Sequence, residues 1–250
     1  EKYKMVLIAL LKSEEERNLI NKLVENIRYI DKDSVVESLK RLSIRINKTF
    51  LAERYNIIVD QRNKSGFYIY QLASDYLNKP LHLIFANEDL GSNNDDLGQV
   101  HSIYLNDAAY SGSQDVVYLN NLTKNTNIAN KDITIAHIGI TNFAINQISH
   151  NLGVKNFMYE YTIPTIEEVF SGEEQSALRR IFPTWSASYE QAVLTFFSHR
   201  IPDNFFGPLH SRIGVYVPSS IDENKPERIS ILNHADFPRP YKKKIASTQG

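Results

Sequence analysis

The chain has 250 residues, of which 42% are apolar and 23% are charged, as is ordinary for a soluble globular protein. Its length suits one large domain or a core domain with an added lobe. A net charge of −1 excludes a general electrostatic attraction to nucleic acid or to an anionic membrane. The absence of cysteine excludes disulfides, thiolate zinc sites and a cysteine nucleophile, and it fits a reducing compartment, so we expect a cytoplasmic protein.

The first fifty residues are expected to form a helical lobe. Apolar residues recur at helical spacing over 12–27, with acids in the first turn, and again over 34–46. The longest apolar run, 5–11, is far shorter than the roughly 20 residues of a membrane-spanning helix. Neither helical segment carries a catalytic constellation, so we interpret this lobe as packing surface or as a contact for a protein partner, and we expect no membrane contact.

From residue 56 short apolar runs alternate with amphipathic segments. Helices are expected over 67–77, 113–122 and 141–153, with Gly153 as a C-terminal cap. Strands are expected at 56–60, 81–86, 100–105, 133–140 and 155–163. This alternation predicts an α/β fold with a mostly parallel sheet that is covered by helices on both faces.

The pattern is weaker after residue 164. Residues 165–182 and 189–200 have helical spacing, and the second segment ends before Pro202. Two late strands are expected over 212–217 and 228–232. The two prolines of 237–244 exclude regular structure there.

The segment SIYLNDAAYSGSQ, residues 102–114, places polar side chains where the third predicted strand ends. Ligands of open parallel sheets bind beyond the carboxyl ends of the strands, which is where Asn106 and Asp107 are expected. The turn of Ser111, Gly112 and Ser113 then opens a helix, whose unpaired N–H groups and dipole favour an anion. An acid and a phosphate-binding turn a few residues apart suit a phosphorylated sugar. The alternative is an ordinary strand end followed by a Ser/Gly helix start.

Residues 102–114 resemble the phosphoribosyl-pyrophosphate (PRPP) signature of type I phosphoribosyltransferases. In that signature a strand leads into two adjacent acids, a few small residues and a Ser/Thr-Gly-Ser/Thr phosphate loop. The resemblance implies a Rossmann-like, mostly parallel sheet with an N-terminal helical lobe over 1–50. It further implies a phosphoribosyltransferase-like domain over 51–250, with a C-terminal hood from about residue 165, and Mg²⁺ as cofactor.

Carried over to this sequence, the resemblance makes Asn106 and Asp107 the catalytic pair that holds the ribose hydroxyls, with Asp107 also near the metal. Position 106 departs from the pattern, because an acid is usual there. Asparagine can hydrogen-bond a hydroxyl but adds no negative charge toward a ribosyl cation or Mg²⁺. The 5′-phosphate loop would consist of Ala109, Tyr110, Ser111, Gly112 and Ser113.

A second anion site is expected about 40 residues earlier, in NIIVDQRNKSGFYIYQL. This segment is again strand, loop and helix, and in phosphoribosyltransferases the corresponding loop binds pyrophosphate. The resemblance assigns this role to Arg62, Lys64, Ser65 and Gly66. The alternative is that Ser65 belongs to an ordinary helix cap.

The segments 198–203 and 238–243 resemble parts of a phosphoribosyltransferase-like branch that is encoded in bacterial conflict and defence loci. This resemblance implies that His199, Arg200 and Asp203 belong to a hood that faces the acceptor. The alternative is that His199 and Arg200 stabilise a helix C-terminus, where cations are favoured.

Three functions stay open. The first is an enzyme that transfers the phosphoribosyl group of PRPP to a nitrogen acceptor, acting as a toxin-like effector. The second is a regulatory module that senses PRPP or a nucleotide, and the third is a structural subunit. Other catalytic motifs are absent: the sequence has no GxxxxGK[ST], HExxH, GxSxG or GxGxxG, and its seven histidines are scattered.

Overall fold

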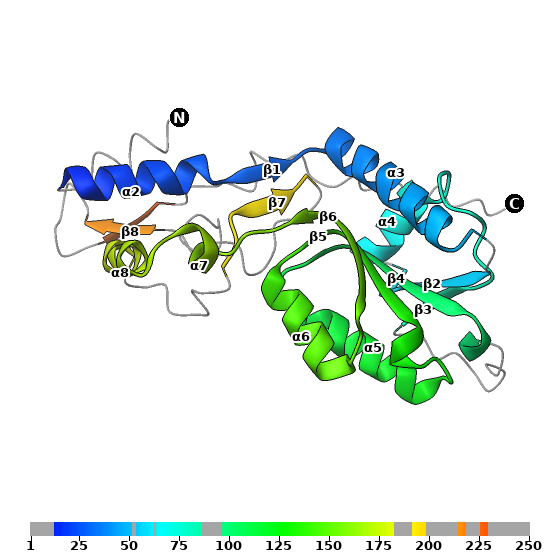
Figure 1. The fold of residues 1–250 in the computed structure, drawn as a ribbon. Coiled ribbons are helices and arrows are strands. Elements are labelled where there is room, and N and C mark those ends of the chain that lie inside the picture. Colours follow the sequence, from blue (N-terminus) through cyan, green and yellow to red (C-terminus); the bar gives the residue numbers. More distant parts are fainter. Residues whose placement is uncertain are drawn as a thin grey trace, which may run out of the picture.

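The predicted α/β architecture is confirmed by a computed structural model (Figure 1). The structure describes residues 13–51, 54–62, 64–86, 97–182 and 192–198, together with the backbone of 215–218 and 226–229. Its main sheet has five parallel strands in the order β3-β2-β4-β5-β6. These strands are β2 (Tyr55–Val59), β3 (Leu83–Phe85), β4 (His101–Ala109), β5 (Ile133–Ile140) and β6 (Asn156–Thr162).

Helices cover both faces of this sheet. Every residue of β5 is buried, which explains why this segment is a continuous apolar run rather than an alternating one. One face packs against α3 and α4 and the other against α5 and α6, each with its own apolar core. The helices are α3 (Lys32–Thr49), α4 (Ser65–Ala73), α5 (Ser113–Asn125) and α6 (Asn142–Leu152).

The strand order creates a topological switch point between β2 and β4. From β2 the chain passes through α4 to β3 on one side, and it returns to β4 on the other side of β2. Both α4 and α5 therefore begin at the same edge of the sheet. Open α/β sheets bind ligands at this kind of point.

A smaller lobe extends away from the main sheet (Figure 1). It contains α2 (Glu14–Glu25), α7 (Ile166–Val169) and α8 (Gly172–Ile181), with a parallel pair of short strands, β1 (Arg28–Ile30) and β7 (Thr195–Phe197). Ser13 and Glu16 form a capping box at the start of α2.

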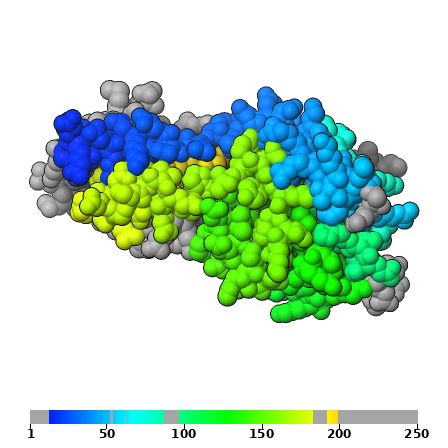
Figure 2. Space-filling view, in the orientation of Figure 1, coloured from blue at the N-terminus to red at the C-terminus, as the bar shows by residue number. Residues whose placement is uncertain are grey.

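Helix α2 packs against α7 and α8 in this lobe (Figure 2). Leu19, Ile20 and Leu23, which form the apolar stripe of the helix, are buried against residues of α7 and α8. Lys22 Nζ also lies 2.8 Å from a carboxylate oxygen of Glu174. The stripe is thus not a free face for a partner. Because α3 packs instead on the main sheet, the contacts do not follow a boundary at residue 50, and that boundary stays a prediction.

The structure corrects several element predictions. Residues 189–200 were expected to be helical, which is wrong, because β7 occupies 195–197. Strand β4 runs on to Ala109 rather than ending at residue 105, because its last residues keep pairing with Gly139 and Ile140 of β5. The single helix expected over 165–182 is interrupted at Phe170 and Ser171, where Ser171 caps α8.

The later strands and the remaining short elements complete the description. β8 (Val215–Pro218) and β9 (Pro226–Ile229) form an antiparallel pair where two late strands were expected. Single 3₁₀ turns precede β4 and β5, at η1 (Leu97–Gln99) and η2 (Asn130–Asp132). Within the described residues, no helix has both the length and the apolar character needed to cross a lipid bilayer.

Candidate functional site

The predicted pyrophosphate loop meets the carboxyl end of β4 at the switch point. Ser65, the first residue of α4, donates a hydrogen bond from Oγ to Oδ1 of Asn106 on β4, over 3.1 Å. This bond joins residues 41 positions apart in the sequence. The loop that ends β2 and the segment that ends β4 therefore lie side by side at one edge of the sheet.

The predicted phosphate loop is a tight turn between β4 and α5. Gly112 has a φ of 71°, and a Cβ there would lie 3.0 Å from the carbonyl oxygen of Ala144, so glycine is required by both conformation and space. Thr141 holds the turn from beside it, because its hydroxyl donates to the carbonyl of Tyr110 and its N–H to the carbonyl of Ala109.

The N-terminus of α5 is left open by this turn. Gly112 is the N-cap and supplies no side-chain hydrogen bond to the first N–H groups of the helix. Ser113 is exposed, and its N–H reaches Oγ of Ser111 at 3.4 Å. Ala109, by contrast, is the last residue of β4 and its side chain is buried, so only its backbone can face a ligand.

The predicted pyrophosphate loop carries two exposed cations. Lys64 is the N-cap of α4 and makes no side-chain cap hydrogen bond. The guanidinium of Arg62 lies over the ring of Phe85, 4.5 Å from its centre, which fixes the cation beside the end of β3. The loop thus brings positive charge and an uncapped helix start to the same edge as the phosphate turn.

Asn106 is largely occupied by the protein itself. It is 4% exposed, and its Oδ1 accepts from both Ser65 Oγ and the N–H of Asp107, the latter over 2.9 Å. Its Nδ2 lies 3.5 Å from the hydroxyl of Tyr104. The side chain therefore ties α4 to β4, and its role beside the ribose hydroxyls stays a prediction.

Asp107 lies at the end of the strand among polar groups, although it is only 2% exposed. Its Oδ1 accepts from the N–H of Ala108 over 2.8 Å. The neighbouring strand brings a second carboxylate, that of Asp60, close enough for the charge of Asp107 to act on it. The carboxylate of Asp107 is thus not enclosed in hydrocarbon.

Asp60 is a site residue that sequence reasoning missed. It is fully buried directly after β2, where Oδ1 accepts from the N–H of Gln61 over 2.8 Å and Oδ2 has no hydrogen-bond partner. Burial raises the pKa of this carboxyl, and the charge of Asp107 raises it further. The signal was present in NIIVD, because an acid that ends one parallel strand faces the same edge as an acid that ends the next.

A further buried polar group lies beneath the site. His137, opposite Asn106 on β5, has Nε2 3.6 Å from Oδ1 of Asp115 in the first turn of α5. The ring of Tyr104 meets that of His137 edge-on, and burial, then the charge of Asp115, raises the pKa of Tyr104 well above its ordinary value. These contacts connect the start of α5 to the strands under Asn106.

The residues present fit a hard divalent cation that takes only part of its coordination from the protein. No cluster of three or more His, Asp or Glu side chains suited to a metal occurs among the described residues. Oδ2 of Asp60 nonetheless has no hydrogen-bond partner, and the charge of Asp107 acts on the Asp60 carboxyl. Mg²⁺ prefers such carboxylate oxygens and keeps several waters and substrate oxygens as its other ligands.

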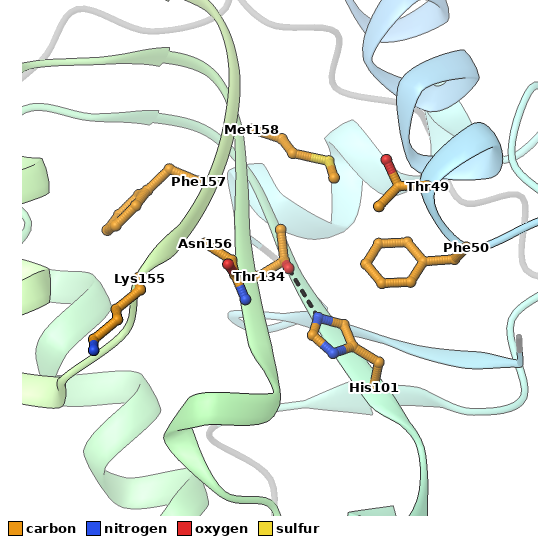
Figure 3. Close-up of a pocket in the computed structure, with 8 residues that line it drawn as sticks. All are labelled: Thr49, Phe50, His101, Thr134, Lys155, Asn156, Phe157 and Met158. Atoms are coloured by element: carbon orange, nitrogen blue, oxygen red, sulfur yellow. Dashed lines mark hydrogen bonds between the residues drawn. The ribbon is translucent and has the colours of Figure 1, made fainter.

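The remaining predicted site residues, His199, Arg200 and Asp203, lie outside the described residues. A hollow of about 350 Å³ lies at the opposite, amino-terminal edge of the sheet (Figure 3). There His101, stacked on Phe50, is 2.8 Å from the hydroxyl of Thr134. Because ligands of parallel sheets bind at the carboxyl edge, this hollow is not the candidate site.

A comparison with known protein families finds one family that matches most of the chain. Residues 11–211 match the model of the PRTase-CE family, in which PRTase abbreviates phosphoribosyltransferase. The chain belongs to the PRTase-CE family. The match spans both the switch point and the smaller lobe, so the type I phosphoribosyltransferase resemblance expected from residues 102–114 is confirmed at the level of the superfamily. No curated protein matches the PRTase-CE chain.

Solved phosphoribosyltransferases are among the structures to which the PRTase-CE chain is similar. The xanthine-guanine-hypoxanthine phosphoribosyltransferase of Helicobacter pylori has a TM-score of 0.38 at 12% identity, with 55% of this chain and 86% of that chain covered. The hypoxanthine phosphoribosyltransferase of Staphylococcus aureus has a TM-score of 0.38 at 10% identity, with 56% of this chain and 80% of that chain covered. The purine phosphoribosyltransferase of Pyrococcus horikoshii has a TM-score of 0.34 at 14% identity, with 54% of this chain and 87% of that chain covered.

Proposed function

We propose that this PRTase-CE chain binds PRPP together with Mg²⁺ at the switch point and transfers the phosphoribosyl group to a nitrogen acceptor. The observation that carries the proposal is the Ser65–Asn106 hydrogen bond, because it joins the predicted pyrophosphate loop to β4, the strand that leads into the predicted phosphate loop, beside buried carboxylates. A ligand with a phosphate at one end and a pyrophosphate at the other requires two such loops at one edge. Membership of the PRTase-CE family supports the same chemistry.

The backbone turn before α5 is proposed to bind the 5′-phosphate. Its uncapped helix N–H groups and the hydroxyls of Ser111 and Ser113 would donate to phosphate oxygens. Lys64 and Arg62 would then receive the pyrophosphate at the start of α4. Between the two loops, Asp107 would hold the ribose hydroxyls.

In the proposed reaction the bond between C1′ and the pyrophosphate oxygen breaks, and its electron pair leaves with pyrophosphate. A bond between C1′ and the acceptor nitrogen forms, and that nitrogen gives up a proton. Asp107 would stabilise the positive charge that develops on the ribose ring, and the two loops would hold the reacting groups in place. When bound, Mg²⁺ supplies positive charge that offsets the negative charge of the leaving pyrophosphate.

The proposal is tested by replacing Asp107 with asparagine, which preserves shape and removes charge. We expect Asp107→Asn to reduce pyrophosphate release from PRPP by at least about 100-fold, as for other losses of one electrostatic group in an active site. The matched control is Asp75→Asn, the same change at an exposed position in the turn that follows α4. Equal activity of both variants, with unchanged melting temperatures, would count against this site.

A second function is favoured by the neutral side chain of Asn106. Because its polar atoms are engaged within the protein, the site has one carboxylate fewer in the 106–107 pair than the signature calls for. A regulatory module that binds PRPP without turnover would show this feature. PRPP-dependent stabilisation without pyrophosphate release, tested over a panel of nitrogen acceptors, would favour the sensor over the enzyme.

The proposed role as a toxin-like effector in a defence system stays a prediction. It rests on the resemblance of 198–203 and 238–243, which lie outside the described residues. The test is expression of the chain in a bacterial host, with Asp107→Asn as the inactive comparison. Growth arrest by the native chain alone is the outcome expected of an effector.

A further inference from the structure

We infer that Asp60 supplies the second carboxylate of this site, in place of the acid that position 106 lacks, and that Asp60 and Asp107 together hold the divalent cation. This inference rests on the proposed function and adds a cation-binding residue to it. In the PRPP signature, the two acids are adjacent residues at the end of one strand. Here one carboxylate is that of Asp60, directly after β2, and the other is that of Asp107 on the neighbouring strand β4.

The position of Asp60 is fixed by close packing. A Cβ on Gly66 would lie 2.8 Å from Oδ1 of Asp60 and 3.1 Å from the carbonyl oxygen of Leu105. The carboxyl group of Asp60 therefore lies close to the start of α4 and to the β4 backbone, one residue before Asn106. Only glycine at position 66 leaves room for the carboxyl group at this place.

The two oxygens of Asp60 have different surroundings. Oδ1 accepts from the N–H of Gln61, which organises the loop that carries the predicted pyrophosphate site. Oδ2 is buried and has no hydrogen-bond partner, and the charge of Asp107 acts on this carboxyl. A buried carboxylate oxygen without a partner, beside a second carboxylate, is strongly unfavourable unless a cation or a proton satisfies it. Oδ2 is therefore the oxygen of Asp60 that can take a cation in place of a proton.

Asn106 is an uncharged residue of this arrangement that connects the start of α4 to β4. Its Oδ1 binds Ser65 and the N–H of Asp107, so it is not directed at a cation. An acid at position 106 would add a third negative charge to those of Asp60 and Asp107 and increase the repulsion among them. The departure from the signature is thus compensated by Asp60 rather than being a simple loss.

The test measures Mn²⁺ binding by electron paramagnetic resonance, in the presence of PRPP, for the native chain, Asp60→Asn and the control Asp75→Asn. Asparagine keeps an acceptor for the N–H of Gln61 and removes only the charged oxygen. We expect Asp60→Asn to weaken Mn²⁺ binding by about 10- to 100-fold, and Asp75→Asn to leave it unchanged. Native Mn²⁺ affinity in Asp60→Asn would overturn the inference.

Binding of ribose 5-phosphate without metal separates a cation ligand from a residue that only shapes the loop. We expect Asp60→Asn to bind ribose 5-phosphate as the native chain does. If that affinity falls as much as the Mn²⁺ affinity, Asp60 acts through the loop and the inference is wrong. If the native chain binds neither PRPP nor ribose 5-phosphate, the proposed function fails as well, whereas native binding with an unaffected variant rejects Asp60 alone.

Discussion

Asp60 and Asn106 differ in how much of their hydrogen-bonding capacity the folded chain already uses. Asn106 has its acceptor oxygen engaged by Ser65 and by the backbone, whereas one oxygen of Asp60 is buried without a partner. The sequence predicts that position 106 faces the ligand edge, because it follows a strand. It cannot predict which side chains there are already engaged, since that depends on contacts between residues 41 positions apart.

The pH dependence of stability provides a test of Asp60 that needs no ligand. Burial and the charge of Asp107 raise the pKa of Asp60 in the folded state. The stability from this group is therefore fully present below its unfolded pKa and is lost as the pH rises through the raised, folded pKa. We expect Asp60→Asn, which does not titrate, to unfold at higher denaturant concentration than the native chain at neutral pH.

This difference should shrink as the pH falls toward the ordinary range of an aspartate, because Asp60 then holds its proton in both states. Denaturant titrations of the two proteins across that range measure it. A constant difference at all pH values would show that the substitution acts through packing and not through the charge.

The phosphate turn provides a second test at the residue scale, with a matched control in the same chain. Gly112 and Gly153 have nearly equal φ values of 71° and 69°, but only at Gly112 would a Cβ meet other atoms within 4 Å. We expect Gly153→Ala to lower the free energy of unfolding by about 1–2 kcal/mol from backbone conformation. Gly112→Ala should lose about 1–3 kcal/mol more from overpacking against Ala144. Equal losses of unfolding free energy in the two variants would show that the turn at Gly112 accommodates a Cβ without overpacking.

At the scale of elements, the ends of β2, β4, α4 and α5 position the site. The periodicity of the sequence predicts all four elements and bounds β5 correctly, because buried parallel strands leave a continuous apolar run. It ends β4 four residues early, at 105 instead of Ala109. Asn106 and Asp107 are polar and interrupt the apolar run, yet pairing with β5 continues past them.

The connection between α4 and β4 is tested by Ser65→Ala, which removes the hydrogen bond to Asn106. We expect the free energy of unfolding to fall by about 0.5–1.5 kcal/mol and PRPP binding to weaken, because the start of α4 loses its tie to β4. Ser74→Ala is the control, since Ser74 is the C-cap of the same helix and its hydroxyl donates an exposed bond to the carbonyl of Gln71. Isothermal titration calorimetry and denaturant unfolding give both quantities. Equal PRPP affinity in the two variants would contradict this role.

At the scale of the whole molecule, the main sheet could be predicted from sequence but the smaller lobe could not. The helix expected over 189–200 is wrong, because the three residues of β7 pair in parallel with β1 at the other end of the chain. Three-residue strands carry no usable periodicity, and pairing over such a separation has no local signal. The apolar stripe of α2 is visible in the sequence, whereas its partners in α7 and α8 are not.

The central claim, that two loops at one edge of the sheet bind the two ends of one PRPP molecule, is tested most directly by hydrogen exchange with ligand fragments. In the presence of Mg²⁺, we predict that ribose 5-phosphate slows amide exchange in residues 111–115. Pyrophosphate should slow exchange in residues 61–66, and PRPP should slow both segments together. Protection of neither segment by PRPP, or of the same single segment by all three ligands, would contradict the account.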